Sequence, residues 1–217
     1  VTPESVEAVV AGAIQLQTLS NEYPAGRPNA VTFTDVRRER NTPVSVMGST
    51  QHVDSQGYGP HIEEVKIYVN NTGVTRKPGE TNSTVSIGGA TPGEATRRVV
   101  THEYGHVIDF RNRGTESERG PAAKMMFRAE QSRQSHGRRL ESDMQDRGFP
   151  ATRKGNPPIT EILAAGVKSP GLGFYALSST AEFMAEAFTA HVHNLDIGGR
   201  GGDPDEIGAE LAKIGRG

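Results

Sequence analysis

The stretch TPGEATRRVVTHEYGHVIDFRNRG, residues 91–114, carries the signals for both ends of a helix and constrains the fold more than any other part of the chain. Thr91 is an N-cap residue, Pro92 suits the first helical position, and Glu94 completes a capping box with Thr91. Gly114 is of the type that ends a helix. Apolar residues precede and follow HEYGH, so the helix is predicted to be mostly buried and its polar side chains need partners.

Two histidines and one glutamate occupy this helix in the sequence HEYGH. His102 and His106 are four residues apart, so their Cβ atoms lie roughly 5–6 Å apart on one helix face and both imidazoles can reach one metal ion. Glu103 points to one side, where it can take a proton from water instead of binding the ion. Gly105 leaves room for substrate or for another segment. The alternative is three polar residues on an ordinary helix, but the buried flanks favour a metal site.

A third ligand has to come from another part of the chain, because catalytic zinc takes three protein ligands. The chain has no cysteine, which leaves His, Asp and Glu as strong ligands. Glu182 and Glu186, in TAEFMAEAF, share one face of an apolar helix and are the best candidates. Ser179 offers another explanation, because as an N-cap it would form a capping box with Glu182. Two carboxylates on an apolar helix favour the metal, but both explanations stay open at this point.

The sequence HEYGHVIDF, followed far downstream by YALSSTAEFMAEAF, resembles the metallopeptidase domain of anthrax toxin lethal factor and its relatives, among them the Pro-Pro endopeptidases. The similarity covers residues 91–111 and 172–190 and is only general elsewhere. It implies that His102, His106 and Glu182 are zinc ligands. It also implies that Glu103 is the general base.

Two further roles follow only from this resemblance. Tyr175, seven residues before Glu182, would donate a hydrogen bond to the oxyanion, and Glu186 would orient a ligand histidine. Without the resemblance, Tyr175 would be an aromatic residue that anchors a glycine-flanked loop by packing. The chain departs from the family pattern at Met184, which replaces a phenylalanine, and in its long Arg-rich stretch. The Arg-rich stretch leaves the zinc site unaffected but makes the substrate preference uncertain.

A chain of 217 residues is long enough for one domain with a substantial core. The expected fold is α+β and zincin-like, with a small mixed sheet over the HExxH helix and a helical C-terminal part. We expect residues 1–217 to form a single domain with four parts: an N-terminal helix and sheet (1–90), the active-site helix (91–114), a solvated Arg-rich helical insertion (115–160), and a helical part with the third ligand (161–217).

Short segments rich in β-branched residues predict the strands of the sheet: AVTFTDV, PVSVMGS, EVKIYVN and STVSIGG. The last of these precedes the active-site helix and ends in glycines. Its alternating polar residues suit a strand with one solvent-exposed face. Val85, Ser86 and Ile87 are therefore the predicted edge along which an extended peptide substrate would pair.

The expected function is that of a zinc-dependent endopeptidase acting on a protein or peptide substrate. The alternatives are a catalytically silent zincin-fold domain in a larger toxin or virion assembly, and hydrolysis of a non-peptide amide. A net charge of −2 gives no indication of nucleic acid as a partner, and the apolar run VEAVVAGAI is too short to span a membrane. Because the chain begins with Val1 and lacks cysteine, we expect a processed or excised product that is secreted or particle-associated.

Overall fold

The computed structural model describes residues 2–34, 48–54, 60–68, 91–114, 120–148, 172, 175–195, 197 and 203–217. Within them the chain is α+β, with five α-helices and one three-stranded mixed sheet. The helices are α1 (Pro3–Glu22), α3 (Pro92–Arg111), α4 (Pro121–Asp146), α6 (Thr180–Val192) and α7 (Asp203–Arg216), with 3-10 turns η1 (Pro24–Gly26) and η4 (Tyr175–Leu177). The strands are β1 (Val31–Thr34), β2 (Gly48–Asp54) and β3 (Pro60–Tyr68).

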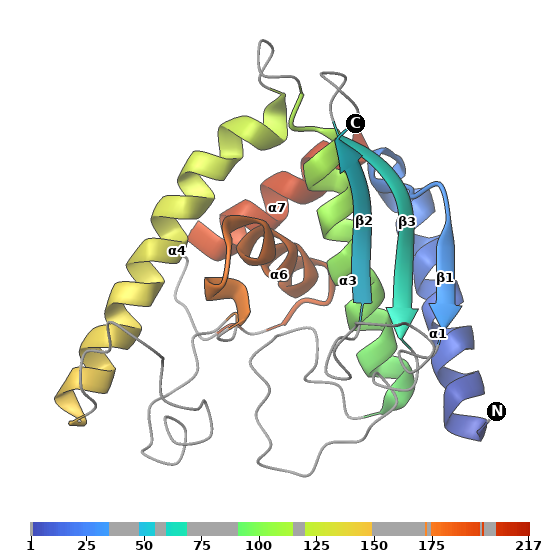
Figure 1. Cartoon of the computed structure of the whole chain (residues 1–217), viewed down its shortest axis with the longest axis horizontal. Coiled ribbons are helices and arrows are strands. Elements are labelled where there is room, and N and C mark those ends of the chain that lie inside the picture. Colours follow the sequence, from blue (N-terminus) through green and yellow to red (C-terminus); the bar gives the residue numbers. More distant parts are fainter. Residues whose placement is uncertain are drawn as a thin grey trace.

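Helix α3 lies at the centre of the arrangement (Figure 1). The sheet and α1 lie against it on one side, while α6 and α7 lie on the other, with α4 outermost. The core around α3 combines apolar residues from these elements, for example Ile67 of β3, Val107 of α3 and Phe188 of α6. Because α3 is covered from both sides, its polar residues are also buried.

Threonine caps α1 and α3, and the predicted start at Thr91 is confirmed. The Thr2 hydroxyl accepts a hydrogen bond from Ser5 N at 3.2 Å at the start of α1, and the Thr91 hydroxyl accepts one from Glu94 N at 3.1 Å at the start of α3. The predicted stop at Gly114 is also confirmed, because α3 ends at Arg111 and Gly114 follows in the left-handed region with a φ of 76°.

The predicted strands agree less well with the sheet. β1 lies within AVTFTDV, β2 includes the last two residues of PVSVMGS, whose first five residues lie outside the described part of the chain, and β3 begins at Pro60, before EVKIYVN. The sheet order is β1-β3-β2, with β1 parallel and β2 antiparallel to β3. Pairing with β3 places the polar sequence GSTQHVD in a strand, because tertiary context outweighs weak local propensity. The segment with Val85, Ser86 and Ile87 lies outside the described residues.

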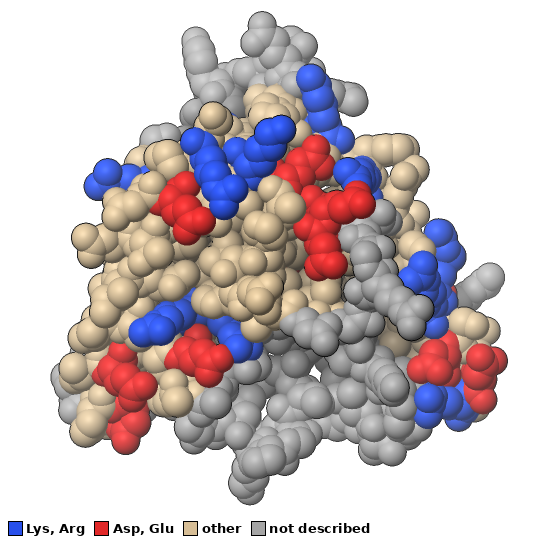
Figure 2. Space-filling model, turned by 180° about the vertical axis from the view of Figure 1, so that it is seen from behind, with Lys and Arg blue, Asp and Glu red and all other residues tan. Residues whose placement is uncertain are grey.

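The visible surface carries charges of both signs. Figure 2 shows acidic and basic side chains interspersed around an uncharged centre on the face seen from behind. Among the described residues, charged side chains form ion pairs, for example Arg128 with Glu210 at 3.3 Å and Arg147 with Asp143 at 3.2 Å. Among the described helices, none combines the length and the apolar character needed to cross a membrane.

Helices α3 and α6 cross closely at Gly105. A Cβ atom added there would lie 3.2 Å from Ala185 Cα and 3.2 Å from Phe188 Cδ1. The space beside this glycine is thus filled by another segment of the protein, one of the two possibilities that the sequence left open. The close crossing brings the polar face of α3 next to the first turns of α6.

Gly105→Ala should lower the free energy of unfolding by about 1–2 kcal/mol, because crowding between the two helices exceeds the gain in helix propensity. Gly137→Ala is the matched control: Gly137 is also helical, and an added Cβ meets nothing within 4 Å. That variant should gain about 0.5–1 kcal/mol. Urea unfolding measures both. Equal stabilisation of the two variants would show that the crossing is not tight.

Candidate metal centre

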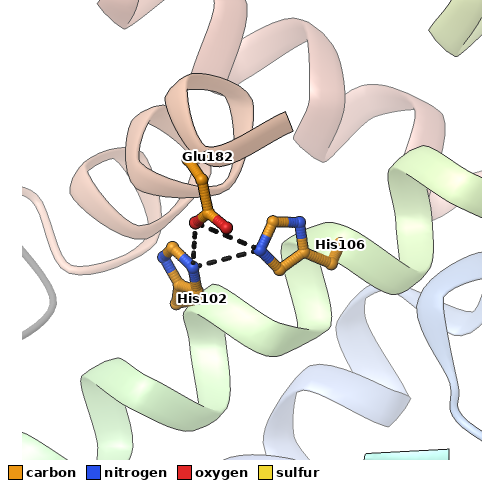
Figure 3. A group of neighbouring side chains, drawn as sticks. All are labelled: His102, His106 and Glu182. Carbon is orange, nitrogen blue, oxygen red and sulfur yellow. Dashed lines mark hydrogen bonds and ion pairs between the residues drawn. The ribbon is translucent and has the colours of Figure 1, made fainter. Parts of the chain in front are cut away.

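Three side chains from two helices converge where α3 and α6 cross (Figure 3). His102 and His106 project from α3, and Glu182 projects from α6. Glu182 Oε2 lies 2.9 Å from His102 Nε2 and 3.4 Å from His106 Nε2, and the two Nε2 atoms are 3.1 Å apart. One ligand atom from each residue lies within 4.8 Å of the others. The structure therefore brings together a buried group that could hold a metal ion.

The donor chemistry of this group suits zinc. Two imidazole nitrogens and a carboxylate oxygen face one another with the histidines only 5% and 7% exposed. In a buried place, lone pairs that converge in this way require a proton or a cation between them. Zinc binds this combination of nitrogen and oxygen ligands, and the chain offers no thiolate.

Glu182 makes two kinds of contact at the start of α6, one through its backbone and one through its side chain. Its backbone N–H donates to the Ser179 hydroxyl at 3.2 Å, so Ser179 caps the helix as predicted. Its carboxylate instead points to the histidines. Burial by itself would raise the pKa of Glu182, but the hydrogen bonds with His102 and His106 outweigh it and hold this pKa well below its usual range. Ser179 is thus the N-cap, but the Glu182 carboxylate contacts the histidines in place of closing a capping box.

Glu186 lies behind His102, on the next turn of α6, and is fully buried. Its Oε1 is 3.0 Å from His102 Nδ1, an ion-pair contact without the alignment of a hydrogen bond. Both ring nitrogens of His102 thus face carboxylates of α6. Burial opposes the charged form of His102, but the negative charge of Glu186 and the hydrogen bond to Glu182 raise its pKa well above the ordinary value.

His106 is oriented by a stack of side chains. Its ring stacks on Phe110, with centroids 5.8 Å apart and planes at 14°, and the guanidinium of Arg113 lies 4.5 Å over the Phe110 ring. Arg113 is in turn held by Asp109, through a hydrogen bond of 2.9 Å from its Nε. This stack was not predicted, although the helical spacing of residues 106, 110 and 113 is a sequence signal that could have revealed it.

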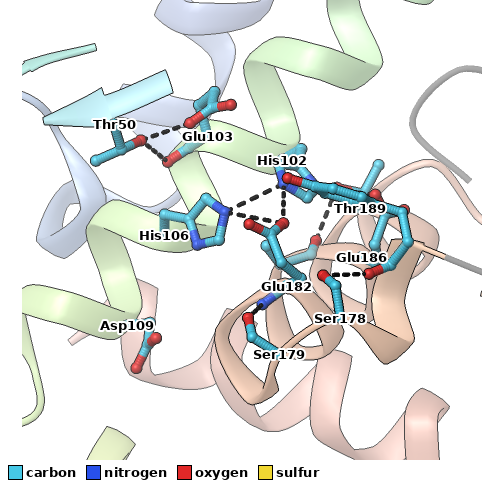
Figure 4. A network of polar contacts seen from close by, with 12 residues as sticks. Thr50, His102, Glu103, His106, Asp109, Ser178, Ser179, Glu182, Glu186 and Thr189 are labelled. Carbon is cyan, nitrogen blue, oxygen red and sulfur yellow. Dashed lines mark hydrogen bonds and ion pairs between the residues drawn. The ribbon is translucent and has the colours of Figure 1, made fainter. Parts of the chain in front are cut away.

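Glu103 lies outside the three-residue ligand group and contacts the sheet (Figure 4). The hydroxyl of Thr50, on β2, donates to Glu103 Oε2 at 2.6 Å. Gly48 lies beside the other oxygen, where any Cβ would come within 2.5 Å of Glu103 Oε1. The strand backbone therefore packs directly on this carboxylate. Thr50 was not predicted from the sequence, because a contact between a strand and a distant helix leaves no local signal.

Tyr175 lies in η4, close to the group. Its ring centroid is 6.1 Å from that of His102, and 42% of the residue is exposed. This exposure argues against a loop anchor that acts by packing. Burial of its hydroxyl end and the negative charge of Glu182 raise the pKa of Tyr175 above its ordinary value, so the phenol keeps its proton.

No family model, curated protein or solved structure matches this chain. The likeness to the lethal factor-like metallopeptidases consequently rests on the two short motifs. The evidence for a metal centre comes from the arrangement of His102, His106 and Glu182.

Zinc binding should release about one proton per ion near pH 6.5. The pKa of His102 is raised by its carboxylates, so its ring is protonated there in the metal-free protein, whereas a ligand imidazole must be neutral. Release should fall as the pH rises above the raised pKa. Calorimetric titration in two buffers of different ionisation enthalpy measures the protons released. His191→Gln, at an exposed position of α6, should leave the number unchanged. Zinc binding without proton release would contradict the prediction.

Proposed function

We propose that this chain is a zinc-dependent endopeptidase with a zincin-like fold, related to the lethal factor-like metallopeptidases. One observation carries the proposal: His102, His106 and Glu182, which come from helices far apart in the sequence, place their ligand atoms within 4.8 Å of one another. Two histidines and a glutamate are a ligand set of catalytic zinc. The motifs HEYGH and AEFMAEAF support the same assignment.

The reaction requires a base beside the ligands, and we assign this role to Glu103. Bound zinc would supply Lewis-acid chemistry, which polarises a carbonyl and makes water a nucleophile near neutral pH. Glu103 takes the proton of the attacking water and passes it to the leaving amine. The hydroxyl of Thr50 donates to Oε2 at 2.6 Å and so holds the carboxylate in one orientation. The backbone at Gly48 packs beside Oε1, so a larger residue there would displace the base.

Tyr175 and Glu186 complete the assignment. The phenol of Tyr175 stays protonated at neutral pH, so it can donate to the negative charge that develops on the substrate carbonyl oxygen. Glu186 holds His102 from the side opposite Glu182, at 3.0 Å from Nδ1, and so fixes the ring in the orientation that a ligand needs.

A catalytically silent domain with the same ligands is the second candidate, and hydrolysis of a non-peptide amide is the third. The presence of Glu103 at the base position of the motif favours the hydrolases over a silent domain, and Thr50 holds its carboxylate in one orientation. Digestion of an unbiased peptide library separates the three. Chelator-sensitive cleavage of peptides is the expected result.

The parent protein should bind one zinc ion per chain, and His106→Ala should lose at least about a hundredfold in affinity, because it removes a ligand. Glu103→Gln should keep the zinc and lose about a hundredfold or more in peptide hydrolysis, because it removes only the base. Elemental analysis and the library digestion measure the two effects. A parent protein that holds no zinc after loading near neutral pH would end the proposal. Equal zinc loss in both variants would reassign Glu103 as a ligand.

Tyr175→Phe should reduce kcat roughly a hundredfold to a thousandfold and leave KM and zinc content near those of the parent. The substitution keeps the ring and removes only the donor to developing charge. Tyr23→Phe is the matched control, since the Tyr23 hydroxyl contacts Arg216 at 3.4 Å, at the end of α7. It should cleave at the parental rate. If Tyr175→Phe also does so, Tyr175 has no part in the chemistry.

A further inference from the structure

Helix α4 holds the start of α6 through one arginine–glutamate pair. Arg133 donates to both oxygens of Glu130, from Nε at 2.8 Å and from Nη2 at 2.7 Å. Its remaining nitrogen, Nη1, donates to the backbone carbonyl of Leu177 at 2.6 Å. Glu130 Oε2 also accepts a hydrogen bond from the hydroxyl of Thr180. The pair thus binds the last residue of η4 and the first residue of α6.

These two anchor points bracket residues 175–182, here called the η4–α6 segment, which presents Tyr175 at one end and Glu182 at the other. The segment is tied together internally, because the N–H and the hydroxyl of Ser178 donate to Tyr175 O at 2.9 and 2.7 Å and Ser179 caps α6. A segment tied in this way moves as one unit. Fixing Leu177 and Thr180 therefore fixes both functional side chains.

Apolar burial does little to fix the η4–α6 segment. Ala176 is its only buried residue, while Tyr175, Ser178 and Ser179 are exposed. Burial of one alanine side chain stabilises by less than the burial of a large apolar residue, which contributes about 1.5–3 kcal/mol. Phe183 and Met184, which follow the segment, are fully buried and anchor the rest of α6, so directional hydrogen bonds to α4 act mainly on η4 and on the start of α6.

The hydrogen bonds between Arg133 and Glu130 are charge-assisted and bidentate, which makes them stronger than hydrogen bonds between neutral groups. Arg133 binds Glu130 with two parallel N–H donors, a geometry that fixes both groups in orientation as well as distance. Arg133, followed by Thr180, lowers the pKa of Glu130 to about 2, so its carboxylate is ionised throughout the neutral range. The two side chains are 25% and 31% exposed, and ion pairs at such positions add little to the stability of a fold. The pair is therefore better suited to positioning than to holding the protein folded.

We propose that Arg133 and Glu130 are positioning residues of the zinc site: through the η4–α6 segment they set Glu182 against the histidines and Tyr175 beside them. The inference rests on the proposed function, because it takes Glu182 as a ligand. From the sequence alone, the Arg-rich helix α4 is expected to be a solvated insertion. In this proposal α4 instead helps to position the side chains of the site.

Arg133→Gln tests the inference, with Arg128→Gln as the matched control. Arg128 lies on the same helix and pairs with Glu206 and Glu210 of α7, away from the η4–α6 segment. Competition with a chromophoric chelator measures zinc affinity, and the visible spectrum of the cobalt-substituted protein reports ligand geometry. Arg133→Gln should lose about tenfold to a hundredfold in zinc affinity, which is the range found for residues that support metal ligands. It should also change the cobalt spectrum. Arg128→Gln should match the parent in both.

A second pair of variants covers the case in which Arg133→Gln does not fold. Thr180→Val removes the donor to Glu130 and keeps the shape of the side chain, whereas Thr180→Ser keeps the hydroxyl. Thr180→Val should weaken zinc binding several-fold and Thr180→Ser should not, with the free energy of unfolding similar in both. A loss of stability without a change in zinc affinity or cobalt spectrum would reduce the pair to a structural role.

The outcomes separate the two proposals. Parental zinc affinity and cobalt spectrum in Arg133→Gln and Thr180→Val would overturn the positioning role and leave a zinc-dependent peptidase intact. A parent that binds zinc but cleaves no peptide, with affinity that depends on Arg133, would reject the peptidase and keep the positioning role. A parent that binds no zinc would overturn both.

Discussion

The buried charge at the crossing of α3 and α6 is the constraint on which the rest of the site depends. His102 lies between Glu182 at 2.9 Å and Glu186 at 3.0 Å, and Glu186 is fully buried. Such groups are costly to remove from water unless each is paired, and removing one partner leaves an uncompensated charge. The pairing needs the two helices to approach closely, which Gly105 permits. The close packing of the two helices and the pairing of their buried charges therefore depend on each other.

The parts of the fold that follow from local signals were predictable. The hydroxyls of Thr2, Thr91 and Ser179 each accept a hydrogen bond from a backbone N–H at the start of a helix. The donor is three residues further along the chain in each case, so four consecutive residues contain the whole signal. β2 was not predictable in the same way. Its sequence GSTQHVD has weak strand propensity, and it is a strand because β3 pairs with it. The α+β class could thus be derived from the sequence, but the register of the sheet could not.

The same distinction applies to the site. His102 and His106 could be predicted as a pair from their spacing on one helix. Glu182 could be predicted from a second helix with two acidic residues on one apolar face. The contacts of Thr50 with Glu103 and of Arg133 with Leu177 join elements that are 53 and 44 residues apart. No periodic pattern relates such positions, so a single sequence contains no signal for them. The proposed ligands and the contacts within one helix could therefore be predicted from the sequence, whereas contacts between distant elements, such as those of Thr50 and Arg133, could not.

Three parts of the proposed site are held by three different elements. α6 supports His102 through Glu186, β2 supports Glu103 through Thr50, and α4 supports the η4–α6 segment through Arg133. An isolated HExxH helix contains none of these three supports, so it specifies two candidate ligands and orients only His106, through the stack on Phe110. Orientation decides whether bound metal can take part in chemistry, because donors and bases act only within narrow limits of distance and angle. A hydrolase and a silent domain with the same motif would therefore differ in these supporting contacts, above all in whether the proposed base is held in one orientation, as Glu103 is by Thr50.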